Sequence, residues 1–181
     1  MGNLVCGADE IVDGLLAEPR ALERLYELMQ AQHKGLVKEA CWTLSNIAAG
    51  SPVHRQALVQ CNFAPALQHV VENAHFDIRK EAAFALSHLV LDPQTRPHVL
   101  TPELGLEFVG LVRAPDFVVV DMALTVVEMV LAEVPGGVRL VEEADGIDAL
   151  EQLVYAQAPA ALVARASALV DKYYGEDAEP Y

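Results

Sequence analysis

One stretch of this chain occurs more than once, and this repetition limits the possible folds more than any other feature. Residues 38–46 read Lys-Glu-Ala-Cys-Trp-Thr-Leu-Ser-Asn, and residues 80–88 read Lys-Glu-Ala-Ala-Phe-Ala-Leu-Ser-His, so the two align without a gap. Weaker copies follow at residues 120–128 and 163–171. Self-similarity at a period of about 40 residues is typical of repeat proteins, in which one supersecondary unit stacks on the next.

Each copy places apolar residues three and four positions apart, which predicts a helix that is buried on more than one side. A second periodic segment precedes each copy, and a short helical piece precedes that, for example at residues 54–60 and 137–143. No stretch sustains the two-residue alternation of a β-strand. Three helices per unit of about 42 residues predict an all-α fold, a right-handed α-solenoid of armadillo repeats. The second segments are residues 21–32, 63–74, 102–113 and 146–157.

The repeats also predict how the chain is divided. Residues 1–18 are expected to be the end of a third helix and its exit loop, left from a preceding repeat. Such an uncapped N-terminal end offers an apolar surface for self-association. An acidic tail is expected at residues 175–181. The armadillo repeats between these segments are expected at residues 19–51, 52–93, 94–134 and 135–174, the last being the terminal repeat.

Composition excludes several classes of function. Twelve Lys and Arg residues against 26 Asp and Glu residues give a formal net charge of −14. A broad positive surface for nucleic acid is therefore not expected, and basic peptides or basic protein surfaces are the natural partners. The most apolar stretch, residues 117–134, is interrupted by acidic residues and predicts a buried helix, so no membrane partner is expected. The three cysteines indicate a reducing intracellular compartment, with Cys41 and Cys61 expected as small buried residues.

No motif in the sequence points to catalysis or to a bound cofactor. The chain has no glycine-rich phosphate loop, no Cys-x-x-Cys, no His-Glu-x-x-His and no Gly-x-Ser-x-Gly. His69 and His75 are six positions apart, a spacing that does not place them on one face of a helix, so a metal pair is not expected. We therefore expect a protein that is not an enzyme and that needs no cofactor and no metal.

Several motifs resemble the importin-α family of nuclear import adaptors. They are Gly2-Asn-Leu-Val-Cys-Gly7, the run from Lys38 to Gly50, the run from Phe76 to His88, and the ending made of residues 142–150 and 171–177. The resemblance runs along the whole chain and implies the last four armadillo repeats of that family. It also implies an adaptor that shuttles between cytoplasm and nucleus and binds proteins with a nuclear-localisation-type basic peptide in a concave groove.

The resemblance implies a peptide site built from the third helix of each repeat. In the family, an Asn of each third helix holds the backbone of an extended peptide, and a Trp one helical turn earlier flanks a basic side chain. Trp42 and Asn46 keep this pair, whereas Phe84 and His88 replace it in the next copy. The residues expected to bind peptide are Asn3, Val5, Cys6, Gly7, Lys38, Glu39, Trp42, Ser45, Asn46, Glu81, Phe84 and His88.

The departures in the second copy predict a weaker and more pH-sensitive site. Phe84 offers a weaker cation–π face than Trp to a lysine ammonium. His88, with an ordinary pKa of about 6.5, is expected to become cationic just below neutrality and to repel a basic peptide. The same two residues support an alternative interpretation, an armadillo scaffold that has lost signal-peptide binding and offers its surface to another protein.

The resemblance implies a further docking site, for the nuclear export receptor, at the terminal repeat. In the family, this repeat and the acidic residues around it dock the receptor that returns the adaptor to the cytoplasm. A solvent-exposed acidic face is the alternative interpretation of the same residues. The corresponding residues here are Glu142, Glu143, Asp145 and Asp171.

Overall fold

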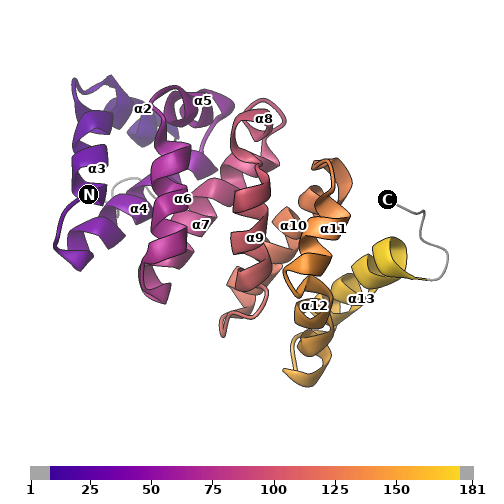
Figure 1. Cartoon of the computed structure of the whole chain (residues 1–181). Helices are drawn as coiled ribbons and strands as arrows, with labels where there is room; N and C mark the ends of the chain where they lie inside the picture. The colour runs from indigo at the N-terminus through magenta and orange to yellow at the C-terminus, as the bar shows by residue number, and fades with distance from the viewer. Residues whose placement is uncertain (1–8, 176–181) are drawn as a thin grey trace. The chain divides into compact units, whose positions relative to one another are not determined.

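The chain folds into helices that are grouped in two compact units, Met1–Val99 and Leu100–Tyr181. The computed structural model describes residues 9–175, and no β-strand occurs among them, so the all-α prediction is confirmed. The first unit holds α2 (Asp9–Ala17), α3 (Ala21–Met29), α4 (Lys34–Ala49), α5 (Pro52–Gln60), α6 (Phe63–Asn73), α7 (Phe76–Leu91) and α8 (Arg96–Val99) (Figure 1). The second unit holds α9 (Pro102–Leu111), α10 (Phe117–Glu133), α11 (Gly137–Glu143), α12 (Gly146–Tyr155) and α13 (Ala160–Tyr174).

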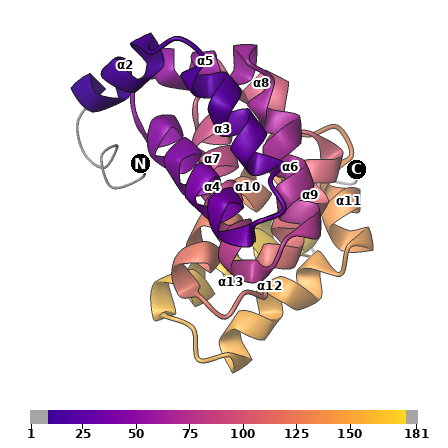
Figure 2. The same cartoon turned by 90° about the vertical axis from the view of Figure 1, so that its left-hand side faces the viewer.

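In the first unit, the two long helices α4 and α7 pack side by side, and α3 and α6 pack against them from one side (Figure 2). The short helices α2, α5 and α8 lie at one end of this arrangement, at the top of both views. A set of three helices ending in a long one therefore occurs twice in this unit, as α2–α3–α4 and as α5–α6–α7. All four copies of the repeated stretch lie within long helices, namely α4, α7, α10 and α13.

Several helices begin where the sequence pattern places them. The second segments predicted from residues 63 and 102 are α6 and α9, and the short piece predicted at residues 137–143 is α11. Pro52 and Pro102 occupy the first helical position of α5 and α9, where the missing N–H removes no intrahelical hydrogen bond. The side chain of Thr101 then accepts a hydrogen bond from the backbone N–H of Leu104, which caps α9.

Small and branched side chains fill the core between α4 and α7. Cys41 and Leu44 of α4 and Ala82 and Leu86 of α7 are fully buried. Burial raises the pKa of the Cys41 thiol to about 12, and the nearby carboxylate of Glu81 adds to this shift, so Cys41 stays protonated and acts as a small apolar residue. The other predicted buried cysteine, Cys61, is in fact exposed, because it lies in the turn directly after the last residue of α5.

Residues 9–18 are the described part of the segment that was expected to hold the end of a third helix and its exit loop. Residues 9–17 form the helix α2, which buries Val12. Asp13 of α2 accepts a hydrogen bond from Nε2 of the buried His54 at 2.7 Å, while Nδ1 of the same ring accepts the backbone N–H of Ser51. This contact attaches α2 to α5, so α2 is positioned as the first helix of a three-helix set. Residues 1–8 and 176–181 lie outside the described residues, and with them Asn3, Val5, Cys6 and Gly7.

The second unit is centred on α10, which packs against α9, α11 and α13. Val120, Leu124 and Val127 of α10 are buried, as the prediction of a buried helix over residues 117–134 requires. No helix among residues 9–175 combines the length and the apolar character that crossing a membrane demands.

The turn into α12 explains why Asp145 is followed by Gly146 in the sequence. Asp145 has a left-handed backbone with φ of 55°, a conformation that Asp and Asn adopt more readily than most residues. At the next position, a Cβ on Gly146 would lie 2.5 Å from the carbonyl oxygen of Val141. Only glycine allows the start of α12 to pack this closely against the end of α11.

Candidate functional site

The candidate site is the face formed by α4 and α7. Trp42 and Asn46 lie one helical turn apart on α4, and Phe84 and His88 have the same spacing on α7. All four side chains are half-buried, between the fully buried core residues and the exposed surface. Because α4 and α7 pack against each other, the two pairs belong to adjacent helices and form a surface that a ligand can contact.

The carboxamide of Asn46 is partly used within its own helix. Its Nδ2 donates to the backbone carbonyl oxygen of Trp42 at 2.9 Å. This bond fixes the rotamer of the amide on the face that carries the indole. One N–H and the amide oxygen remain to bond a ligand, since an Asn side chain has two donor hydrogens and one acceptor oxygen.

Ser45 is placed differently from what the sequence predicts. Its side chain is buried, and its hydroxyl donates to the carbonyl oxygen of Trp42 at 2.8 Å. Ser87 repeats this arrangement on α7, where it donates to Phe84 at 2.8 Å and is also buried. The shared Ser therefore serves the packing of the two helices. In this conformation its hydroxyl is not presented to a ligand.

The charged residues of this face are of both signs. Glu81 is half-buried and Glu39 is exposed, while Lys38 is half-buried. Burial raises the pKa of Glu81, and the nearby Lys80 and Lys38 offset only part of this shift. The carboxylate of Glu81 thus lacks full compensation for its loss of hydration. A further cation placed beside it would favour its charged form.

His88 is less readily protonated than the sequence predicts. Burial, and secondarily the positive charge of Arg55, lower its pKa from the ordinary value of 6.5. The imidazole therefore becomes cationic at a lower pH than the sequence predicted. The pKa of His88 could not be predicted from the residue type, because the degree of burial and the distance to Arg55 are properties of the fold.

A pocket of about 500 Å³ opens beside His88, at the end of the α4/α7 face. Its wall is formed by the end of α7, the loop that follows it, and the start of α5. The lining residues include Pro52, Arg55, His88, Leu91, Asp92 and Gln94.

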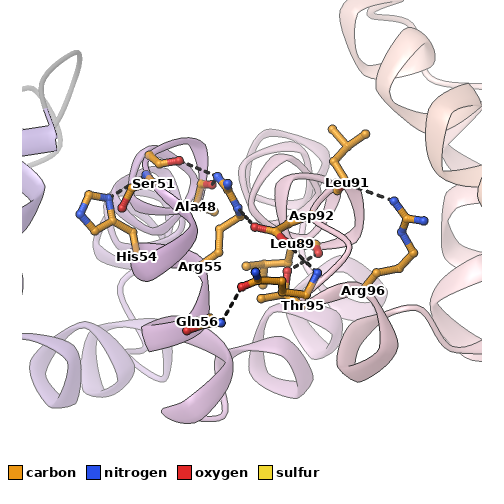
Figure 3. Close-up of polar contacts among 12 residues, drawn as sticks. Ala48, Ser51, His54, Arg55, Gln56, Leu89, Leu91, Asp92, Thr95 and Arg96 are labelled. Atoms are coloured by element: carbon orange, nitrogen blue, oxygen red, sulfur yellow. Dashed lines mark hydrogen bonds and ion pairs between the residues drawn. The ribbon is translucent and has the colours of Figure 1, made fainter.

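Arg55 lines this pocket and is held in place by hydrogen bonds to three residues (Figure 3). Its Nε donates to Oδ2 of Asp92 at 2.6 Å, and one terminal nitrogen donates to the carbonyl oxygens of Ala48 and Gly50. A guanidinium at the carbonyl end of a helix is favourable, because those carbonyls have no partner within the helix. The hydrogen bond from Arg55 lowers the pKa of Asp92, and the N–H of Gln94 adds to this effect.

Arg96 makes the equivalent contact one repeat later. Its side chain donates to the carbonyl oxygens of Val90 and Leu91 at the end of α7. Sequence reasoning missed both arginines. The available signal was the Pro-x-x-Arg spacing, which occurs at Pro52–Arg55 and again 41 positions later at Pro93–Arg96.

The structure leaves the expected export-receptor residues exposed and does not bring them together into one polar cluster. Glu143 forms an exposed ion pair with Arg139 at 2.7 Å. The backbone carbonyl of Asp145 accepts a hydrogen bond from Arg113 at 2.7 Å. Within the described part of the chain, no hydrogen bond or ion pair joins Glu142, Glu143 or Asp145 to Asp171, which lies on α13.

Comparison with known proteins identifies the repeat and its relatives. The family described as armadillo/beta-catenin-like repeat matches residues 14–49, which cover the second half of α2, α3 and α4. Over 98% of its length the chain is 33% identical to importin subunit alpha-2 of Oryza sativa subsp. japonica, and over the same share it is 34% identical to importin subunit alpha-9 of Arabidopsis thaliana. The chain spans 37% of the length of each of these relatives.

Solved structures agree on the fold. Computationally designed armadillo repeat proteins for modular peptide recognition match with a TM-score of 0.79 and 22% identity, over 94% of this chain and 71% of theirs. A designed armadillo repeat protein in complex with the peptide (KR)4 matches with a TM-score of 0.75 and 23% identity, over the same shares. The prediction of an armadillo α-solenoid is thereby confirmed.

Proposed function

This chain carries armadillo repeats of the importin-α family, and on that premise we propose that it is a non-enzymatic adaptor that binds an extended basic peptide on the α4/α7 face. The observation that carries the proposal is the half-buried Trp42–Asn46 pair on α4, next to Phe84 and His88 on α7. Aromatic faces beside a free amide suit a peptide with basic side chains, since the rings attract the cations and the amide bonds the peptide backbone.

The mechanism is capture of the peptide without any covalent step. Asn46 offers its remaining N–H and its amide oxygen to the peptide backbone, and Trp42 and Phe84 flank the stem of a lysine or arginine. Glu81 supplies the electrostatic attraction. The pKa of Glu81 is raised because Lys38 and Lys80 only partly compensate its negative charge. An ammonium group of a bound peptide would complete this compensation, which supports the role of Glu81.

The direct test compares a labelled Lys/Arg-rich octapeptide with an Asp/Glu-rich peptide of equal length by fluorescence polarisation. We expect binding of the basic peptide only, at least about tenfold tighter than the acidic control. Because the peptide favours ionised Glu81, whose pKa is raised, affinity should fall as the pH is lowered from 7 toward 5. The variant Glu81→Gln should bind more weakly at pH 7 and show a smaller pH slope. Equal binding of both peptides would contradict the proposal.

A second prediction concerns Phe84 and His88, the pair on α7 that is expected to bind a basic peptide more weakly than Trp42 and Asn46. Phe84→Trp should strengthen binding of the basic peptide by about twofold to tenfold, because indole gives a stronger cation–π interaction than a phenyl ring. His88→Asn should change the pH dependence between pH 6 and 7.5 less than the loss of an ordinary histidine would, since burial and the charge of Arg55 lower the pKa of His88. Calorimetric titration of the single and double variants at both pH values measures this. A steep slope that disappears only in His88→Asn would show that His88 titrates near neutrality.

We extend the proposal to nuclear transport, with cargo proteins that carry a nuclear localisation signal, docking of the export receptor near Glu142, Glu143, Asp145 and Asp171, and shuttling between cytoplasm and nucleus. The similarity to importin subunits alpha-2 and alpha-9 supports this extension. The exposure of all four acidic side chains is compatible with docking.

An armadillo scaffold without signal binding is the second candidate function. It is favoured by the buried hydroxyl of Ser45 and by the positive charges of Lys38 and Lys80 on the same face. Such a scaffold would discriminate poorly between the basic and the acidic octapeptide, so the polarisation experiment separates the two functions.

A further inference from the structure

One arginine of the second unit binds residues of α10 that correspond to the proposed peptide-binding face of the first unit. Arg165 of α13 reaches across to α10, where its guanidinium donates to Oδ1 of Asp121 at 3.0 Å and to Oγ1 of Thr125 at 2.9 Å. It also contacts Oε2 of Glu128 at 3.1 Å. Asp121, Thr125 and Glu128 are spaced by four and three residues, so they share one face of α10. The side chain of Arg165 is 29% exposed.

Alignment of the repeated stretches shows which residues of the first unit correspond to Asp121 and Glu128. Glu128 aligns with Asn46 and His88, the residues expected to contact the backbone of a peptide. Asp121 aligns with Glu39 and Glu81, which supply negative charge in the first unit. Asp121 and Glu128 of α10, which align with the acidic and the backbone-binding residues of the first unit, therefore both bind a single cation from within the chain.

Arg165 itself departs from the repeat. In the preceding copies the same position holds Ala40, Ala82 and Met122, and all three are buried. Packing between adjacent third helices thus does not require an arginine at this position. A long cationic side chain here instead places a guanidinium over the acidic face of the neighbouring helix.

We propose that Arg165 is a specificity-determining residue that excludes basic peptides from the α10/α13 face. This inference rests on the proposed function, since it concerns which helices of the chain accept such a peptide. The guanidinium satisfies Asp121 and Glu128 with the same chemistry that an arginine of a peptide would use. A peptide must therefore displace Arg165, and leave its charge without a partner, before it gains any contact with α10.

The test uses the labelled peptide (KR)4 and measures fluorescence polarisation. The starting protein is Trp42→Ala/Asn46→Ala, in which the first site is removed. Adding Arg165→Ala, which introduces the residue that the repeat has at position 82, should increase affinity for (KR)4 at least about tenfold. Adding Glu128→Gln to that protein should remove most of the gain. Amide exchange should show new protection of residues 117–133 with peptide only in the Arg165→Ala protein.

The outcomes separate this inference from the proposed function. If Arg165→Ala remains helical and gives no gain, the inference is wrong, whatever the first site does. If Trp42→Ala/Asn46→Ala binds (KR)4 as tightly as the unmodified chain, the proposed function is wrong, while the comparison with and without Arg165 still decides the inference. Arg165→Met, which introduces the residue found at position 122, is a second variant that controls for an effect specific to alanine. Loss of helical circular dichroism in both variants would show that Arg165 is needed for folding, and it would overturn the inference.

Discussion

Replacing Trp42 and Asn46 together by alanine should weaken binding of a Lys/Arg-rich peptide at least about 30-fold, because it removes both a cation–π contact and hydrogen bonds to the peptide backbone. The helical circular dichroism should survive, since both side chains are only half-buried. Polarisation and circular dichroism on the same samples measure the two effects.

Two further variants make this result interpretable. Trp42→Phe keeps an aromatic face and should lose only part of the affinity. Val53→Ala changes a side chain of α5 that is 71% exposed, and it should leave binding unchanged. If Trp42→Ala alone unfolds the chain, the indole is a core residue and the assignment of the site fails.

The change Arg55→Ala should lower the Tm by at least about 5 °C, because it removes the hydrogen bonds to Asp92, Ala48 and Gly50 together. Asp92 would then be left as a nearly buried carboxylate without its cation. Differential scanning calorimetry measures the Tm, and amide exchange should locate the loosened region in α4, α5 and the loop after α7.

Arg24→Ala is the matched control for this prediction. Arg24 pairs with Glu27 on the surface of α3, where both side chains are largely exposed. An exposed pair of this kind contributes little, so the Tm should change by no more than about 2 °C. A drop as large for Arg24→Ala as for Arg55→Ala would mean that the partners of Arg55 are not the source of its effect.

The long helices could be predicted from the sequence because their packing has a strong periodic signal. Residues 38–46 and 80–88 match in composition as well as spacing, and prolines or glycines mark the starts of several helices. The helix α2 was missed although Asp9 and Glu10 stand in its first turn, a recognised start signal. The side chain of Asp13 in this helix bonds to His54, a contact 41 positions away that the local pattern does not reveal.

The sequence was sufficient to choose candidate site residues but not to predict their state. Asn46 and His88 could be chosen because they recur at the period of the repeat, and their role in binding stays a prediction. The protonation of His88, the orientation of the Ser45 hydroxyl and the role of Arg165 were not, because each depends on a neighbouring element. The pKa of His88 is set by burial and by Arg55, and Arg165 acts through residues of α10.

The small residues between α4 and α7 bear on how long a peptide this face can hold. An extended peptide advances about 3.3 Å per residue, so side chains on one of its sides recur every ~6.6 Å. The axes of packed helices usually lie about 8–10 Å apart, which is more than the spacing between these peptide side chains. Cys41 and Ala82 are both small and fully buried, and small side chains at a contact favour the short end of that range. Small buried residues at such positions therefore favour a spacing nearer to two residues of peptide per helix, because a closer approach of the helices brings their separation nearer to ~6.6 Å.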